Sequence, residues 1–504
     1  MEIIEEIQDI EEEGEVFLCS NSRTFVWILT NNNKIILSEN IKCHNFVYKQ
    51  KVYFTSKLTK LNELPLDSSN KPPPDLIYAL FSQYEFYSID INFIKQGTID
   101  NQFQIITGKL CVTSKTRWGI TSKGLYKYTF KPLDNNYPTY IVASKIKPGH
   151  NDIYAKVEIQ PWNDSDSHPK GIFVETIGEI TNDDIYDTTI INSHNVLSRN
   201  RNKVFRSAKK DYAFDSNCYS IIDEDWTEID TYSIDPEGCK DIDDAISIKN
   251  IDGLFEYAVH IATPSNFFKI NSDIDKISRL TTTSIYTNDT VYNLIPPILS
   301  ENKASLLENN IRYCLSVIWS NNTNPRIVRT KISNNKAYSY EDFDKSIELK
   351  NKIINVFNIV FKNKPIDSHE LIEQSMINAN KFVAEFLVKN IGEDTLLRKT
   401  YNKSAWYLPY KNNKDNSHES VEANLYTHFT SPIRRYADQI VHRHIFSILD
   451  KLTTTSICNL DSIIRMNLVK LKTKKIQSQI AWKDIAIKNQ NVHIIGELIY
   501  VYDH

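Results

Sequence analysis

Several features that mark other protein classes are scarce or missing in this chain of 504 residues. No run of 18 or more apolar residues occurs, so we expect no membrane-spanning helix. The acidic opening, MEIIEEIQDIEEEGE, is unlike a signal or transit peptide. The seven cysteines are odd in number and scattered, with no C-x-x-C pair, which predicts reduced thiols rather than a disulfide framework. We therefore expect a cytoplasmic protein.

The overall composition is that of a globular protein with more than one domain. Hydrophobic residues make up 41% of the chain and the mean hydropathy is −0.40. This length is sufficient for two to four domains, one of them with a sizeable core. The net charge of −4 is not that expected of a nucleic-acid-binding protein. However, nucleic-acid binding depends on where positive charge is concentrated on the surface and not on the net charge. We favour a monomer.

Four carboxylates fall close together in the segment 233–247, SIDPEGCKDIDDAIS. Acids this close repel one another, so each disfavours the ionised form of its neighbour unless a cation neutralises them. Oxygen ligands without a nearby His or thiolate pattern favour Mg²⁺ or Mn²⁺. The segment therefore indicates metal-assisted chemistry on phosphate esters. The four acids are Asp235, Asp241, Asp243 and Asp244.

Two other interpretations of this segment were weighed. A solvated acidic loop is the commonest origin of an acidic run, but the interleaved Ile242, Ala245 and Ile246 indicate that part of the segment is buried. A calcium loop of the EF-hand type needs a Glu at its twelfth position. Counted from Asp235, the twelfth residue is Ile246, which excludes that loop.

A second segment, 426–443, reads YTHFTSPIRRYADQIVHR. Pro432 is predicted to open a helix with Ser431 as its cap. Arg434 and Arg435 would then lie in the first turn, where anions rather than cations are favoured. Their presence indicates a bound anion such as a phosphate. Taken alone, the segment is also compatible with an ordinary ion-paired helix.

Together, SIDPEGCKDIDDAI and HFTSPIRRYADQIVHR resemble the signature blocks of the RNase II/RNase R exoribonucleases, the family defined by the RNB catalytic domain. They look nearer to the eukaryotic exosome-subunit branch than to the bacterial one. Three intermediate blocks, at 257–268, 283–319 and 370–384, are similar to family blocks in the same order. The resemblance covers roughly residues 225–450.

The resemblance implies an α+β fold, in which an RNB domain with a mixed sheet surrounded by helices follows β-barrel modules of the OB or cold-shock type. It implies an Mg²⁺-dependent (Mn²⁺ is possible) hydrolytic 3′→5′ exoribonuclease that degrades single-stranded RNA to nucleoside 5′-monophosphates by a two-metal mechanism. A catalytically weak or inactive RNB-fold RNA-binding subunit is the alternative. Retention of all four acids and Arg434 favours the enzyme.

The resemblance also assigns roles to individual residues. Asp243 and Arg434 match catalytic positions, and the four acids match the metal ligands. The positions that match the RNA channel are Phe267, as an aromatic on which the terminal base stacks, Tyr286, Glu373 and Arg435.

The expected domain organisation follows from composition and resemblance. A basic stretch at 465–475 is either a helix face near the RNA or a solvated surface. Aromatic and cationic residues alternate over 115–131, and about half of these aromatics are expected in a barrel core. The expected parts are a β-rich module (1–70), a Pro-containing linker (71–95), an OB or cold-shock-like RNA-binding module (96–190), a connector (191–224), the RNB domain (225–455), and a basic helix with the truncated start of an OB-fold domain (456–504).

The chain departs from the family pattern at several places. Thr263 stands where many members have an Asp, and the phrase LLRKTYN at 396–402 lacks the His that members often have there. The stretch between Asn380 and Tyr426 is short. These departures put the secondary polar contacts around the RNA channel in doubt but leave the four acids intact.

Overall fold

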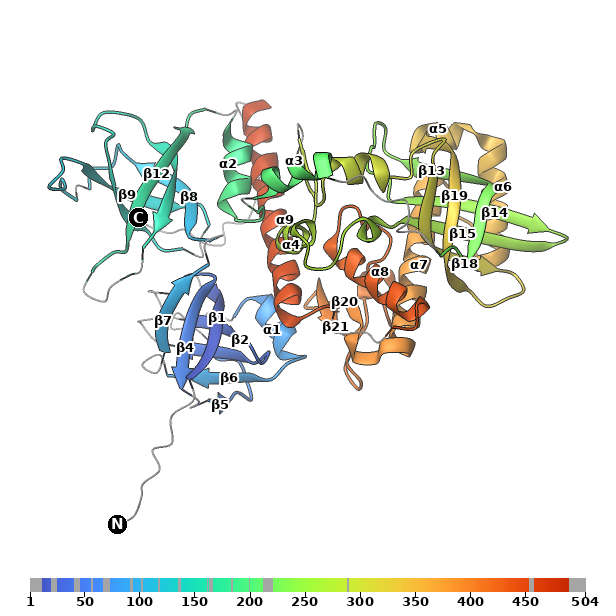
Figure 1. Cartoon of the computed structure of the whole chain (residues 1–504), viewed down its shortest axis with the longest axis horizontal. Helices are drawn as coiled ribbons and strands as arrows, with labels where there is room; N and C mark the ends of the chain where they lie inside the picture. The colour runs from blue at the N-terminus through green and yellow to red at the C-terminus, as the bar shows by residue number, and fades with distance from the viewer. Residues whose placement is uncertain are drawn as a thin grey trace, which may run out of the picture.

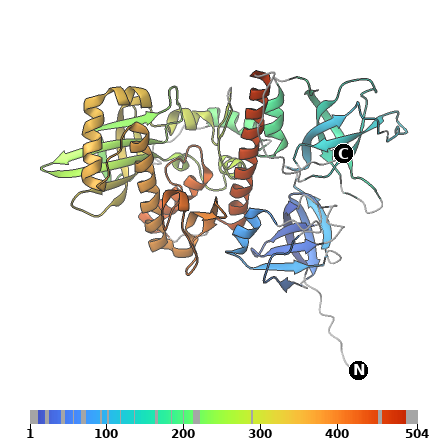
Figure 2. The same cartoon turned by 180° about the vertical axis from the view of Figure 1, so that it is seen from behind.

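The computed structural model describes residues 11–19, 25–39, 46–55, 58–66, 73–90, 94–100, 103–116, 118–134, 137–160, 162, 166–182, 185–198, 200–211, 221–287, 290–452 and 457–488. Two β-rich modules lie on one side of the long helix α9 (Leu460–Lys488), and a larger α+β domain lies on the other (Figure 1). The same division is seen from behind (Figure 2). The expected α+β class with preceding β modules is confirmed.

The first module is a seven-stranded sheet in the order β5-β6-β3-β2-β1-β4-β7. Strand β6 (Phe86–Ile89) lies within the expected linker at 71–95, and β7 (Ile94–Ile99) begins at the end of it. The expected linker is therefore wrong, because this stretch belongs to the module. The reason is that α1 buries Leu76, Ile77 and Leu80 against the core around Trp27. The elements are β1 (Glu11–Cys19), β2 (Phe25–Thr30), β3 (Ile35–Glu39), β4 (Gln50–Thr55), β5 (Thr59–Lys60), α1 (Asp75–Phe81), β6 (Phe86–Ile89) and β7 (Ile94–Ile99).

The second module is a closed five-stranded barrel in the order β10-β12-β11-β8-β9. β10 pairs in parallel with β12 and the other pairs are antiparallel, which is the pairing of an OB barrel. Tyr128 and Phe130 are buried in its core, whereas Trp118 is half-buried; Arg117 lies outside the described residues. The strands are β8 (Ile105–Cys111), β9 (Tyr126–Pro132), β10 (Tyr140–Ser144), β11 (Ile153–Ile159) and β12 (Lys170–Glu179).

The third domain is built on a closed barrel in the order β13-β14-β15-β18-β19. β13 pairs in parallel with β19 and the remaining pairs are antiparallel, which matches the expected mixed sheet. Helices α6 and α7 pack against β15. The strands are β13 (Glu224–Asp235), β14 (Asp244–Ile251), β15 (Leu254–Ala262), β16 (Ile285–Tyr286), β17 (Val291–Tyr292), β18 (Ile311–Ser320), β19 (Arg326–Ser339), β20 (Leu396–Tyr401) and β21 (Ser404–Pro409).

Helices surround this barrel and connect it to the β modules. Within the described ranges, none of them is both long and apolar enough to cross a membrane. They are α2 (Tyr186–Ser193), α3 (Arg201–Asp211), η5 (Pro264–Phe267), α4 (Asp273–Thr281), η6 (Leu299–Lys303), α5 (Tyr340–Lys345), α6 (Ile347–Phe361), α7 (Ser368–Ile391), η7 (Gly392–Asp394), η8 (Glu419–Val421) and α8 (Tyr436–Leu449).

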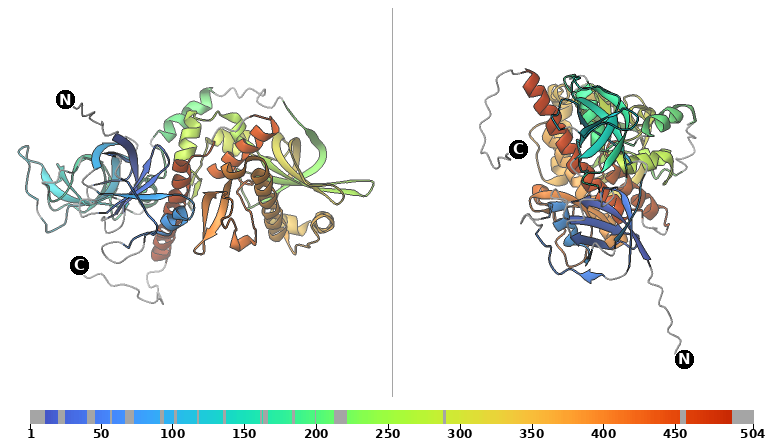
Figure 3. Two further views of the ribbon diagram at one scale, coloured as in Figure 1. Left: turned by 90° about the horizontal axis from the view of Figure 1, so that it is seen from below. Right: turned by 90° about the vertical axis from the view of Figure 1, so that its left-hand side faces the viewer.

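Helix α9 joins the modules through buried cations, as its position between them suggests (Figure 3). The Arg465 guanidinium donates to the backbone carbonyls of Leu280 and Asn195. Lys472 donates to the Asp134 carboxylate at 2.8 Å and to the His194 carbonyl at 3.1 Å. These two cations of the basic stretch therefore neither face RNA nor cover a solvated surface. The expected start of a C-terminal OB-fold domain lies outside the described residues.

Replacing Lys472 with Met is expected to destabilise the contact between α9 and the second module by about 3 kcal/mol, because it leaves the Asp134 carboxylate buried and uncompensated. Urea unfolding followed by far-UV circular dichroism measures the change. Lys475→Met, at an exposed position three residues further along α9, is the control and should have little effect. Equal stability of the two variants would contradict a joining role for Lys472.

Candidate active site

The two motifs found in the sequence meet at one cavity of about 620 Å³. The acidic segment follows β13 and enters β14, while the arginine segment precedes α8. Tyr286 of β16 and Glu373 of α7 face the same space. Of the expected site residues, the cavity is lined by Asp235, Asp241, Asp243, Asp244, Tyr286, Glu373, Arg434 and Arg435.

Asp243 joins the two motifs directly. Its carboxylate is 4% exposed and accepts a hydrogen bond of 2.8 Å from the Ile433 N–H, 190 residues away in the sequence. Its second oxygen, Oδ2, lies 3.6 Å from Arg434 Nε. The backbone of Asp243 is fixed as well, because its carbonyl accepts from the Ala262 N–H at the end of β15. This carboxylate therefore cannot move without disturbing both segments.

Helix α8 begins at Tyr436, so the expected start at Pro432 is wrong. The chain around Arg434 is instead tied to a neighbouring segment: the Ser284 N–H donates to the Arg434 carbonyl, and the Tyr436 N–H donates to the Thr282 carbonyl. These bonds hold Arg435 in an extended conformation, with φ −131° and ψ 128°. A tertiary pairing thus delays the helix by one turn.

Asp438, in the first turn of α8, supports this arrangement. It is fully buried, accepts from the Ser431 N–H at 2.8 Å, and holds the Arg435 guanidinium through two hydrogen bonds of 2.8 Å. Arg435 is therefore occupied by an ion pair within the protein. Arg434, by contrast, keeps 48% of its side chain exposed and faces Asp243. The two adjacent arginines, which the sequence did not distinguish, have different surroundings.

Both oxygens of the Asp241 carboxylate have partners. The Tyr286 hydroxyl donates to Oδ2 at 2.7 Å, and the Cys239 thiol lies 3.7 Å from Oδ1. Among the described residues, no three acidic, His or Cys side chains are gathered closely enough to form a ready metal site.

The acids nevertheless carry an electrostatic cost. Burial, followed by the charges of Asp244 and Asp241, raises the pKa of Asp235 to about 8. Burial raises the pKa of Asp244 to about 6 even though Arg434 and Arg435 lower it, and burial raises the pKa of Asp243 well above its ordinary value. Oδ2 of Asp235 and Oδ2 of Asp243 are buried without a hydrogen-bond donor in the described part of the chain. Such a group favours a proton or a cation.

Phe267 lies apart from these residues. It lines a second, largely apolar cavity of about 1070 Å³ that shares no residue with the acidic one. Thr263, which departs from the family pattern, lines this second cavity too, and its hydroxyl donates to the Tyr313 carbonyl at 3.0 Å. The structure therefore does not bring Phe267 to the site where a terminal base would stack.

The cavity wall also contains residues that were not predicted as site residues, among them Tyr340, Asn380 and Tyr426. Asn380 of α7 accepts from the Phe429 N–H at 2.8 Å and donates to the Tyr426 hydroxyl at 3.0 Å. It thereby holds the segment that leads to Arg434. Asn380 lies within one of the family-like blocks, so the sequence contained a signal for it, whereas the contact itself depends on the tertiary fold.

In the absence of divalent ions, the raised pKa of Asp235 and Asp244 should make the folded state less stable as the pH rises from about 4 to 8. An unfolded Asp loses its proton near pH 3.9, whereas the folded Asp235 keeps its proton until about pH 8. Between these values the folded state binds more protons, so stability falls by up to about 1.4 kcal/mol per pH unit for each such group. Thermal unfolding in EDTA measures the slope, and Asp235→Asn should flatten it; an unchanged slope would contradict the shift.

Comparison with known proteins gives a consistent result. The RNB domain family matches residues 223–357 and 394–451. The exosome complex exonuclease RRP44 of Mus musculus is 25% identical over 453 residues, which cover 67% of this chain and 47% of that protein. The chain thus spans about half the length of the curated relatives it matches.

Solved structures share the fold at lower identity. Mycoplasma genitalium RNase R, solved in complex with ribose-methylated single-stranded RNA, superposes with a TM-score of 0.63 at 17% identity, covering 93% of this chain and 85% of that one. Yeast Ssd1, described as a pseudonuclease, superposes with a TM-score of 0.61 at 15% identity, covering 93% of this chain and 73% of that one. The chain therefore contains a matched RNB domain, and it is similar in sequence and in fold to the RNase II/RNase R exoribonucleases.

Proposed function

We propose that this chain is a hydrolytic 3′→5′ exoribonuclease that degrades single-stranded RNA to nucleoside 5′-monophosphates. One observation carries the proposal: four carboxylates of one motif and Arg434 of another line a single cavity, although the motifs are 190 residues apart. Phosphodiester hydrolysis needs an activated water and stabilisation of charge on the phosphate and on the leaving oxygen. Carboxylates and a guanidinium together suit those needs.

The acidic wall fits divalent cations, with Mg²⁺ or Mn²⁺ favoured because all four donors are carboxylate oxygens. Buried oxygens of Asp235 and Asp243 without hydrogen-bond donors, together with raised pKa values, support this fit. The residues that would hold the ions are Asp235, Asp241, Asp243 and Asp244. Two such ions, when bound, would stabilise the attacking and leaving oxygens. Each oxygen of Asp241 has one contact, from the Tyr286 hydroxyl or the Cys239 thiol, and keeps a second lone pair for a cation.

Arg434 would act on the phosphate itself. Its exposed guanidinium can form charge-assisted hydrogen bonds to non-bridging oxygens. Asp243 holds Arg434 at the cavity, and the Ile433 N–H holds Asp243. In the net reaction water adds to phosphorus, the bond from phosphorus to the 3′ oxygen breaks, and the proton passes to that oxygen. Arg435 serves in this scheme to position Arg434, because its own guanidinium pairs with Asp438.

An RNB-fold protein that binds RNA without cutting it is the second candidate. The fold shared with Ssd1, which is described as a pseudonuclease, favours it. The enzyme needs the four carboxylates for cleavage, whereas the binding protein does not. Cleavage of RNA by the wild type, lost when one of these acids is replaced, would therefore distinguish the enzyme from the binding protein.

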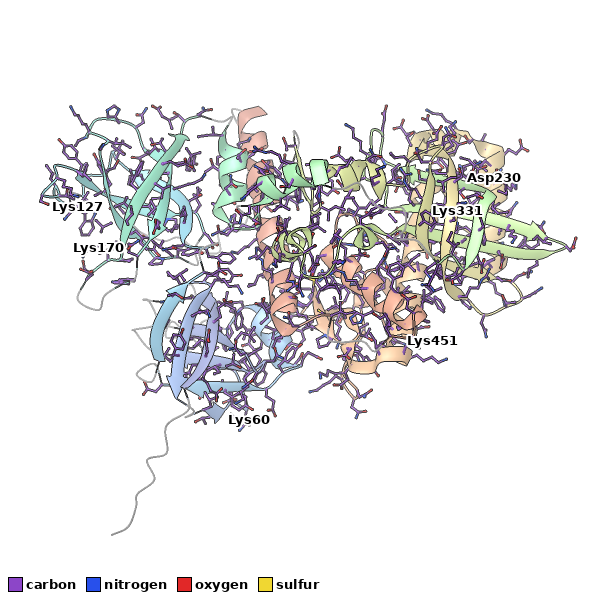
Figure 4. The ribbon with its side chains drawn as sticks, viewed as in Figure 1. Lys60, Lys127, Lys170, Asp230, Lys331 and Lys451 are labelled. Atoms are coloured by element: carbon purple, nitrogen blue, oxygen red, sulfur yellow. The ribbon has the colours of Figure 1, made fainter. Side chains whose placement is uncertain are left out.

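Asp243→Asn is expected to abolish cleavage while RNA binding survives, with a rate loss of at least about 10²–10³. The assay uses 5′-labelled single-stranded RNA with Mg²⁺ or EDTA, and follows shortening from the 3′ end. Asp230→Asn is the matched control, because Asp230 is an exposed acid of β13 outside the cavity (Figure 4). Cleavage by Asp243→Asn at the rate of the control would contradict the assignment.

Arg434→Met should slow cleavage by about 10²–10³, because the phosphate loses a charged donor during the reaction. Arg434→Lys should recover only part of this loss, since an ammonium cannot make the same two-pronged contact. Single-turnover rates at saturating enzyme separate this effect from binding. If Arg434→Met lowered affinity alone and left the single-turnover rate unchanged, Arg434 would only bind substrate.

A further inference from the structure

Two cationic side chains and a histidine gather near one wall of the acidic cavity. Arg398 belongs to β20, His418 immediately precedes η8, and Lys470 belongs to α9. The centroid of the His418 ring lies 5.0 Å from that of Tyr426, and Tyr426 lines the acidic cavity. One aromatic side chain therefore separates this cationic group from the cavity.

Arg398 is buried and has no ion pair with any of the residues that the structure describes. Its side chain is 8% exposed, and Nη1 has no hydrogen-bond acceptor within the described residues. The guanidinium lies 4.5 Å from the centroid of the Tyr407 ring. A cation–π contact offsets only part of the cost of burying a charge, which normally requires a paired or hydrogen-bonded partner.

Arg443 and Arg465, the other buried arginines of the described residues, each have a carboxylate or carbonyl partner, although Nη2 of Arg443 has an ion pair without hydrogen-bond geometry. Arg465 donates to the carbonyls of Leu280 and Asn195, and Arg443 pairs with Asp275 at 2.7 Å. Of these three buried arginines in the described part of the chain, Arg398 alone has neither a carboxylate nor a backbone carbonyl as a partner of its side chain. Structural burial alone does not explain this difference.

Lys470, which donates to the Ala405 carbonyl, adds positive charge near Arg398, and the His418 imidazole does not neutralise that charge. His418 is 7% exposed, and its Nδ1 has no hydrogen-bond partner among the described residues. Burial, then Arg398, lowers the pKa of His418, while burial, then Arg398 and Lys474, lowers the pKa of Lys470 to about 8. No acidic side chain is among the groups that shift these two pKa values. The side chains of Arg398, His418 and Lys470 together therefore favour a bound anion.

We propose that Arg398, His418 and Lys470 form an anion subsite that takes a phosphodiester of the RNA strand, upstream of the linkage held at the acidic cavity. This rests on the proposed function. A phosphate offers several acceptor oxygens and a negative charge, which match the unpaired guanidinium and the imidazole. Half-buried Lys470 opens the group to solvent, and its position on α9 links RNA binding to the helix that joins the three domains.

Fluorescence anisotropy in EDTA tests the subsite without cleavage. Arg398→Met and Lys470→Met are each expected to weaken binding of a single-stranded hexadecanucleotide about tenfold. Each should also make the dependence of log affinity on log salt shallower by about 0.7, the loss of one phosphate contact. A trinucleotide, measured by competition, should bind the variants and the wild type equally, because it is too short to reach past the Tyr426 wall. Lys451→Met, an exposed lysine beyond the far end of α8, is the control (Figure 4).

The location is tested with hexadecanucleotides that carry one neutral methylphosphonate linkage at successive positions. In the wild type, a methylphosphonate at one internal position should weaken binding. At that position, and at no other, Arg398→Met should cause no further loss of affinity. Lys470→Met replaces the ammonium that lies 4.7 Å from the centroid of the Trp406 ring by an apolar side chain of similar length, and provides the test if Arg398→Met does not fold.

The outcomes separate the subsite from the proposed function. Wild-type binding by both variants, with the wild type still cutting RNA in Mg²⁺, would overturn the subsite and leave the exoribonuclease standing. Equal loss of trinucleotide and hexadecanucleotide binding would also overturn it, since the cations would then act on the cavity as a whole. A wild type that neither binds nor cuts RNA would overturn both.

Discussion

The hydrogen bond from the Ile433 N–H to the buried Asp243 carboxylate is the contact on which the site depends. It attaches the segment before α8 to the acidic segment at the start of β14. Arg434 reaches the cavity only because Ile433 is held there, and Asp243 is held in turn by the backbone bond to Ala262. Stability and the geometry of the site therefore rest on the same buried carboxylate.

That carboxylate also creates an imbalance of charge that the protein alone does not remove. The pKa values of Asp235, Asp243 and Asp244 are raised by burial, and Arg434 compensates only in part. Near Tyr426, Arg398 and Lys470 lie together, and no acidic side chain is among the groups that shift their pKa values. An acidic wall that favours cations and a cationic group that favours phosphate are the two surfaces a nuclease of polyanions needs. The proposed function and the proposed subsite both follow from this separation of charge.

The acidic wall of the cavity could be predicted from the sequence, but the residues around that wall could not. Four acids among buried isoleucines required a shared environment, and the structure brings all four to one cavity. The start of α8 could not be predicted, because pairing of Ser284 with the Arg434 carbonyl, a contact between distant segments, outweighs the local preference for a helix at Pro432. The different roles of Arg434 and Arg435 have the same origin, since Asp438 selects only one of them.

Other expectations failed where a local pattern had two physical meanings. The Pro-rich break at 71–75 is typical of a linker, yet α1 directly after it is held by the apolar core of the first module. The basic stretch at 465–475 was expected to be either a helix face near the RNA or a solvated surface, but Lys472 is buried in an ion pair with Asp134, which lies 338 residues earlier in the chain. Phe267 matches a family block, but the turn after β15 directs it to the second cavity.

Electron paramagnetic resonance of Mn²⁺ tests directly whether the buried acids hold a cation, because it detects the cation without relying on cleavage. We expect the wild type to bind Mn²⁺ at neutral pH and to bind it more weakly as the pH falls and protons compete for Asp235 and Asp244. Asp243→Asn should lose most of this binding. Asp230→Asn should bind as the wild type does. Absence of bound Mn²⁺ in the wild type, or binding that survives Asp243→Asn unchanged, would contradict the claim that the buried acids exist to hold a cation.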